Sequence, residues 1–86
     1  MITREVLASR LRDYLQHRLT RAALVDWAEN AIMDGEFEER DLDTIRDITS
    51  RLGLADVREF GLTWEDCDAY LSRLGYRAKV DVVRAS

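Results

Sequence analysis

The single histidine and the single cysteine are the residues of this chain best suited to nucleophilic or metal chemistry. A cysteine nucleophile needs a base within hydrogen-bond reach, and a zinc site needs paired ligands at short spacing. His17 and Cys67 are fifty residues apart in the sequence. Each also has a structural explanation, because His17 falls at the end of a predicted helix and Cys67 on the apolar side of another. We therefore predict no nucleophilic and no zinc site.

Carboxylates are the other groups that could act as acids, bases or metal ligands. Glu65 and Asp66 stand together, but they fall in the first turn of a predicted helix, where capping and the helix dipole explain them. A calcium loop needs glycine at its sixth position and glutamate at its twelfth, whereas a loop starting at Asp34 has Glu39 and Ile45 there. The chain also has no glycine-rich phosphate loop. The sequence thus predicts a protein that is not an enzyme and has no metal or cofactor.

Acidic residues are concentrated between residues 26 and 47. This stretch holds nine acids and two arginines, a net charge of −7, whereas residues 1–25 carry +3 and residues 48–86 carry no net charge. One interpretation is a docking surface for a basic protein, because complementary potential speeds association and selects partners. The residues of this predicted partner-binding site are Asp34, Glu36, Phe37, Glu39, Asp43 and Asp47.

Helix electrostatics is a second interpretation of the same acids. Acidic side chains before and inside the first turn of a helix stabilise its dipole. Glu36 with Arg40, and Asp47 with Arg51, also have the i,i+4 spacing of helical ion pairs. Phe37, which interrupts the acids, is either an interface anchor or a side chain packed against a neighbouring helix. The sequence leaves both interpretations open.

The arginines near the N-terminus could instead form a DNA-binding surface. A DNA-reading helix presents several arginines along one side. At 100° per residue, Arg10 and Arg12 lie about 160° apart, on opposite edges of the apolar stripe, and the acids Glu5 and Asp13 occupy the outward face. Arginines that cover the edges of a core with their aliphatic stems explain this pattern better. A small homodimeric DNA-associated regulator is therefore the alternative function, and nucleic acid is not the partner we predict.

Four segments have apolar residues at helical spacing, about residues 3–17, 21–34, 42–52 and 64–74. The predicted fold class is mainly α, a compact bundle of about four short helices. The broad apolar stripe of residues 21–34 makes that segment the best candidate for the central helix. Trp27 and Trp64 lie at apolar helical positions and are the predicted large anchors of the core.

Capping residues mark the ends of these segments. The predicted N-caps are Thr3, Thr20, Asp41 and Thr63. The predicted C-terminal glycines, which can adopt a left-handed conformation, are Gly35, Gly53 and Gly75.

Residues 1–76 form a single predicted helical domain, and residues 77–86 form a C-terminal tail. The tail alternates around Val80 and Val82, the only β-like pattern in the chain. Because a lone strand leaves its backbone groups unpaired, the tail either pairs with the connector at residues 57–62, pairs with another chain, or is disordered.

Composition narrows the class of protein further. With 86 residues, 47% of them hydrophobic and 35% charged, the chain is long enough for one globular domain. The lone cysteine excludes an internal disulfide, and no apolar run is long enough to cross a bilayer, so we expect a cytoplasmic protein without membrane contact.

Together these features predict a small acidic intracellular interaction module that binds a basic protein through residues 34–47. Its size, acidity and helical content resemble those of the bacteriocin nuclease immunity proteins, which cover a basic enzyme. The likeness is one of class, and no residue motif carries it.

Overall fold

Four α-helices make up most of the described chain. The computed structural model describes residues 1–55 and 61–77, with helices α1 (Arg4–Leu15), α2 (Arg21–Asp34), α3 (Leu42–Gly53) and α4 (Trp64–Arg73). A short 3-10 turn, η1 (Glu39–Asp41), leads into α3. The predicted fold class is confirmed, and each helix begins and ends within two residues of its predicted bounds. The predicted pairing of the tail with the 57–62 connector falls outside the described residues.

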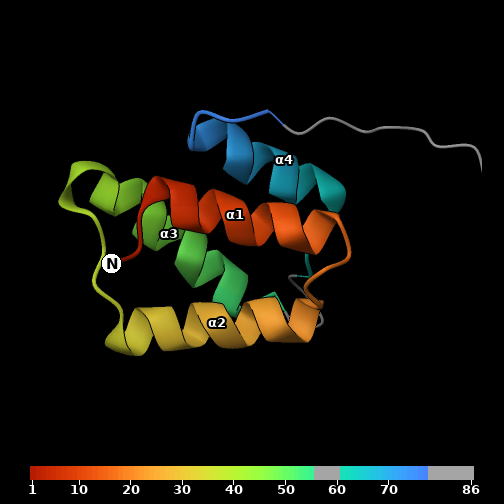
Figure 1. Cartoon of the computed structure of the whole chain (residues 1–86), viewed down its shortest axis with the longest axis horizontal. Coiled ribbons are helices and arrows are strands. Elements are labelled where there is room, and N and C mark those ends of the chain that lie inside the picture. The colour runs from red at the N-terminus through yellow and green to blue at the C-terminus, as the bar shows by residue number, and fades with distance from the viewer. Residues whose placement is uncertain (56–60, 78–86) are drawn as a thin grey trace, which may run out of the picture.

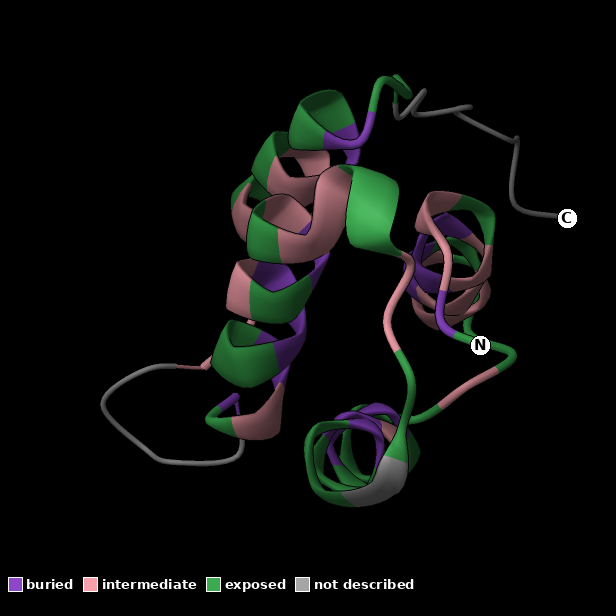
Figure 2. Cartoon of the chain, turned by 90° about the vertical axis from the view of Figure 1, so that its left-hand side faces the viewer, coloured by how far each residue is buried: buried purple, intermediate pink, exposed green. Residues whose placement is uncertain are grey.

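The four helices pack around a shared core. Figure 1 shows α1 between α2 and α4 and antiparallel to both, while α3 crosses behind α1 towards α2. Figure 2 shows the buried faces of these helices turned towards one another. Within the described residues, no helix is both long and apolar enough to cross a membrane.

The core is centred on α3. Four α3 residues, Ile45, Ile48, Thr49 and Leu52, are fully buried. The polar one among them is satisfied, because the Thr49 hydroxyl donates a hydrogen bond to the Ile45 carbonyl oxygen at 2.7 Å. The other helices complete the core with Leu7, Leu11, Leu24, Ala28, Cys67, Leu71 and Leu74. We predicted α2 to be the central helix. It lies partly at the surface instead, since its residue Met33 is 77% exposed.

One of the two predicted tryptophan anchors lies at the surface. Trp27 is half-buried against the core, with the Arg10 guanidinium 5.5 Å from its ring centre. Trp64 is 42% exposed, so its predicted place in the core is wrong. The buried side of α4 is formed by Cys67 and Leu71, and Trp64 lies in the first turn, at the edge of that stripe.

Threonine caps begin three of the helices, as predicted. The hydroxyls of Thr3, Thr20 and Thr63 each accept a hydrogen bond of 3.1 Å from a backbone N–H in the following turn. At α4 the Asp66 carboxylate also accepts from the Thr63 N–H at 3.0 Å, which completes a capping box. Asp41 precedes α3 but makes no side-chain cap bond. Its carboxylate pairs instead with Arg4, so Asp41 occupies the predicted N-cap position but the predicted cap hydrogen bond is absent.

The helix ends follow the predicted glycines only in part. Gly75 is left-handed (φ 89°), and the N–H of Tyr76 donates to the carbonyl oxygen of Leu71, which gives α4 a Schellman end. Gly35 is extended instead (φ −78°, ψ 149°). Glycine is required there for space, because a Cβ atom would lie 2.5 Å from the Ala31 carbonyl oxygen.

Candidate functional site

The loop between α2 and η1 is fixed by the residue that precedes α1. The Ile2 N–H donates to the Glu36 carbonyl oxygen at 2.6 Å, and the Glu38 N–H donates to the Ile2 carbonyl oxygen at 2.9 Å. These two bonds form a parallel bridge between Ile2 and Phe37. The Ile2 side chain is buried in the core, with 9% of the residue exposed. The backbone beneath residues 36–38 is therefore anchored to the core through Ile2.

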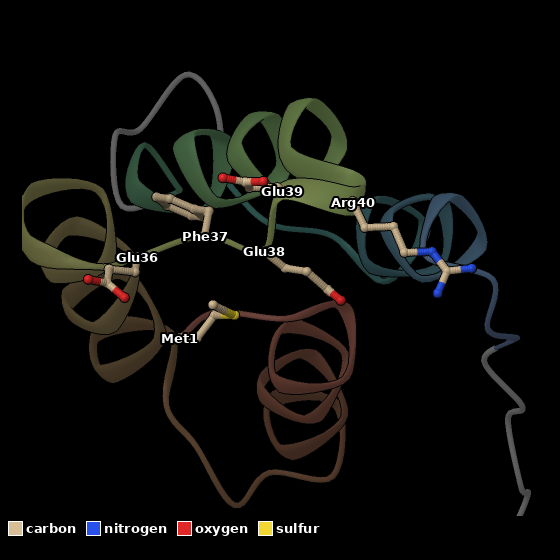
Figure 3. Close-up of a pocket in the computed structure, with 6 residues that line it drawn as sticks. All are labelled: Met1, Glu36, Phe37, Glu38, Glu39 and Arg40. Carbon is tan, nitrogen blue, oxygen red and sulfur yellow. The ribbon is translucent and has the colours of Figure 1, made fainter.

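A shallow pocket opens beside this bridge. Its lining combines two large apolar side chains with three acids and one base: Met1, Phe37, Glu36, Glu38, Glu39 and Arg40. In Figure 3 the Phe37 ring lies between the side chains of Glu36 and Glu39, and the Arg40 guanidinium points away from it. Met1 is 76% exposed, whereas Phe37 is half-buried against the core. The pocket lining is thus partly apolar and otherwise mainly acidic.

Two acids of the 26–47 stretch are neutralised within the fold. Asp47 lies 3.2 Å from the Arg51 Nε and 2.8 Å from an Arg73 terminal nitrogen. The Arg73 hydrogen bond, assisted by Arg51 and opposed by partial burial, holds the pKa of Asp47 below its ordinary value. Asp41 accepts hydrogen bonds from Arg4 at 2.5 and 3.2 Å, and this pairing raises the pKa of Arg4. These two carboxylates hold α3 to α4 and η1 to α1.

Three other predicted site residues are exposed acids: Glu36, Glu39 and Asp43. Within residues 1–55 and 61–77, none of them has an ion-pair partner within 4.0 Å. The predicted pair between Glu36 and Arg40 is absent there, because residue 36 lies in the extended loop and not in a helix. Their charge is therefore not compensated by the described part of the fold.

The structure brings together only part of the predicted site. Glu36, Phe37 and Glu39 line one pocket, and Asp43 lies in the first turn of the adjoining α3. Asp47 faces α4 through its bond to Arg73 and does not share this surface as a free charge. Asp34 is the last residue of α2, and its side chain falls outside the described part of the structure.

Sequence reasoning missed Met1, Glu38 and the supporting role of Ile2. A usable signal existed for Ile2, which stands just before the Thr3 cap with Leu7 at the fourth helical position, the pattern of a hydrophobic staple. No local pattern marks Met1 as a pocket residue, because its contact with the 36–40 segment joins parts of the chain far apart in sequence.

The residues considered first for chemistry are not arranged for it. Cys67 is fully buried, and burial, with a smaller effect of Asp66, raises the pKa of its thiol to about 11. His17 is exposed at the end of α1. It occupies a left-handed position (φ 60°), after which the Arg18 N–H donates to the Asp13 carbonyl oxygen in another Schellman end. Among the described residues, no three His, Cys, Asp or Glu side chains lie close enough to hold a metal ion.

Arginines of α1 make contacts within the fold. Besides Arg4 with Asp41 and Arg10 with Trp27, Arg12 lies 3.4 Å from Asp13. Arg10 faces α2, while Arg4 faces η1. A DNA-binding surface would need several arginines on one side of the helix. These contacts therefore do not support the DNA-binding alternative.

Similarity to other proteins does not supply a function for this chain, so a functional proposal depends on the surfaces described above. No protein-family model, no curated protein and no solved structure matches this chain.

Proposed function

We propose that this protein is an interaction module that binds a basic partner protein through an acidic surface around Phe37. We name this surface the Phe37 face and define it by Glu36, Phe37, Glu39 and Asp43. The observation that carries the proposal is that its three acids are exposed and have no ion-pair partner among the described residues. Uncompensated charge next to an aromatic side chain suits an interface with a basic partner, because complementary charge favours association and aromatic residues are enriched at interfaces.

Electrostatics would set the kinetics and selectivity of such binding. Exposed like charges raise the association rate of an oppositely charged protein, and salt screens the effect over about 8 Å at physiological ionic strength. Asp41 and Asp47 contribute little to this field, because bound arginines offset their charge. Phe37 supplies the apolar contact that charge alone lacks.

The support beneath the Phe37 face favours binding without large rearrangement. The Ile2 bridge fixes the backbone at residues 36–38, so less ordering is needed when a partner docks. This arrangement suits an inhibitor-like or immunity-like role, in which a small acidic protein covers a basic surface. The compartment we propose is the cytoplasm, where an unpaired cysteine such as Cys67 stays reduced.

The test is charge reversal on the Phe37 face with a control of equal charge change. One variant carries Glu36→Lys, Glu39→Lys and Asp43→Lys. The control carries Asp26→Lys, Glu29→Lys and Glu65→Lys, three exposed acids on α2 and α4. Each protein is used at low salt to capture partners from an extract of its own cell, and bound proteins are eluted with salt and identified by mass spectrometry.

We expect the unmodified protein and the control to retain the same basic protein and the Phe37-face variant to lose it. The purified partner should then bind with an affinity that falls as salt rises. Capture of no basic protein, or equal loss in both variants, would contradict the proposal. Thermal unfolding of all three proteins shows whether a lost capture reflects a lost fold.

A further inference from the structure

The pocket beside Phe37 differs chemically from the rest of the acidic surface. Its lining combines the apolar side chains of Phe37 and Met1 with the carboxylates of Glu36, Glu38 and Glu39. A ligand matched to this lining must offer both an apolar stem and a positive charge. A small metal ion has no apolar part, and an apolar side chain would leave the surrounding carboxylates without a partner.

We propose that this pocket receives an arginine side chain of the basic partner, an inference that rests on the proposed function. The aliphatic stem would cover Met1, and the guanidinium would lie against the Phe37 ring within reach of the Glu36 and Glu39 carboxylates. Arginine fits better than lysine because its planar guanidinium is weakly hydrated, stacks on aromatic rings and binds carboxylates through two parallel bonds. Lysine carries the same charge on a compact, strongly hydrated group.

The molecule already contains one contact of this kind. The Arg10 guanidinium lies 5.5 Å from the centre of the Trp27 ring, within the range of a cation–π interaction. The pocket offers a partner's arginine a similar aromatic surface, with acids added around it. Arg40 is the one base in the lining, and in Figure 3 its guanidinium is turned away from Phe37. Its charge still weakens the attraction for an incoming cation, which gives a variant expected to bind more tightly.

The experiment compares two blocked peptides of equal charge, acetylated and amidated tri-arginine and tri-lysine. Each is titrated at low salt into the isotopically labelled full chain, and amide chemical shifts are followed by NMR. We expect the arginine peptide to bind about two- to fivefold more tightly, as a solvent-exposed cation–π contact provides. Its shift changes should be concentrated at residues 36–40.

Two single variants sharpen the comparison. Phe37→Leu keeps an apolar side chain but removes the ring, so the preference for arginine should fall to what the carboxylates alone provide, while both peptides still bind through charge. Arg40→Gln should tighten both peptides, by about two- to threefold at low salt. If Phe37→Leu does not fold, the comparison of the two peptides on the unmodified protein still tests the arginine pocket.

The outcomes separate this inference from the proposed function. Equal affinity for the two peptides, a preference of undiminished size in Phe37→Leu, or shifts spread over distant acids would overturn the arginine pocket. If charge reversal on the Phe37 face still abolishes capture of the basic partner, the proposed function survives that result. If capture is also unaffected by the reversal, both proposals fail.

Discussion

Two sets of acids from one stretch of sequence have different places in this fold. Asp41 and Asp47 are bound by arginines, whereas Glu36, Glu39 and Asp43 are exposed with no such partner in the described chain. All five are carboxylates within twelve residues of one another. Helix electrostatics, which we weighed against a docking surface, accounts for part of the Asp47 network through its i,i+4 pair with Arg51. No ion pair of this kind involves the exposed set in the described chain, and the proposed docking surface rests on that set.

The difference arises from residues far away in the sequence. The arginine that binds Asp41 lies 37 residues earlier, and one of the two that bind Asp47 lies 26 residues later. Within the described residues, no arginine forms an ion pair of this kind with Glu36, Glu39 or Asp43. Summed charge along a sequence therefore overstates the charge that a surface presents, because tertiary pairing removes some of it.

The largest expected effect comes from removing the anchor beneath the exposed set. Ile2→Ala should lower the free energy of unfolding by about 2–3 kcal/mol, since it empties a buried site. Ile32→Ala is the matched control, because Ile32 is 41% exposed and should cost under about 1 kcal/mol. Urea unfolding measures both. Equal losses would mean that Ile2 does not anchor the loop.

Substitution of Gly35 tests the packing of the loop against Ile2, because Gly35 lies next to the Ile2 side chain. In Gly35→Ala the new methyl group would lie 2.5 Å from the Ala31 carbonyl oxygen and 2.8 Å from Ile2 Cδ1. We expect a loss of about 1–3 kcal/mol, together with amide shifts at residues 36–38. Gly53→Ala meets only ordinary contacts at 3.7 Å and beyond, and should stabilise the helix by up to about 1 kcal/mol. If Gly35→Ala left the free energy of unfolding unchanged, the Ile2 side chain and the Ala31 backbone would be able to move aside for the new methyl group.

Local patterns were sufficient to predict the helices and most of their starts. Spacing of apolar residues defined four segments, and the hydroxyls of Thr3, Thr20 and Thr63 cap as expected. These features depend on neighbours within one or two turns. The prediction for Trp64 was wrong because periodicity alone does not show whether a first-turn residue on an apolar stripe is covered by the rest of the fold, and Trp64 is 42% exposed.

The candidate site was predictable only in outline. Charge placed it near residues 34–47, and Glu36, Phe37 and Glu39 do share one pocket. The pairing of Asp41 with Arg4 and of Asp47 with Arg73 could not be read from spacing, because both join separate helices. The same limit applies to the bridge made by Ile2. Its staple position could be read from the sequence, but its two backbone bonds reach a loop more than thirty residues away.

A smaller effect on stability should distinguish Asp47, which is bound by arginines, from Glu36, which is exposed without an ion pair among the described residues. Asp47→Asn removes the charge that forms ion pairs with Arg51 and Arg73 and should lower the free energy of unfolding by at most about 1 kcal/mol, since these pairs are partly exposed. Glu36→Gln should leave stability unchanged, because no ion pair of Glu36 is present among the described residues. Binding of the basic partner should be weakened more by Glu36→Gln than by Asp47→Asn. If Glu36→Gln destabilised the protein as much as Asp47→Asn, the division between the two sets would be wrong.

The smallest expected effect is the pH dependence of the Asp47 bonds. Because the pKa of Asp47 is lowered in the folded protein, folding at this residue favours the carboxylate over the protonated acid. The resulting stabilisation is complete above the ordinary pKa of 3.8 and is lost as pH falls through the lower folded value. The difference in stability between the unmodified protein and Asp47→Asn should thus shrink as pH falls from 7 to 2 in urea titrations. A difference that stayed constant over this range would mean that Asp47 acts through the shape of its contacts and not through its charge.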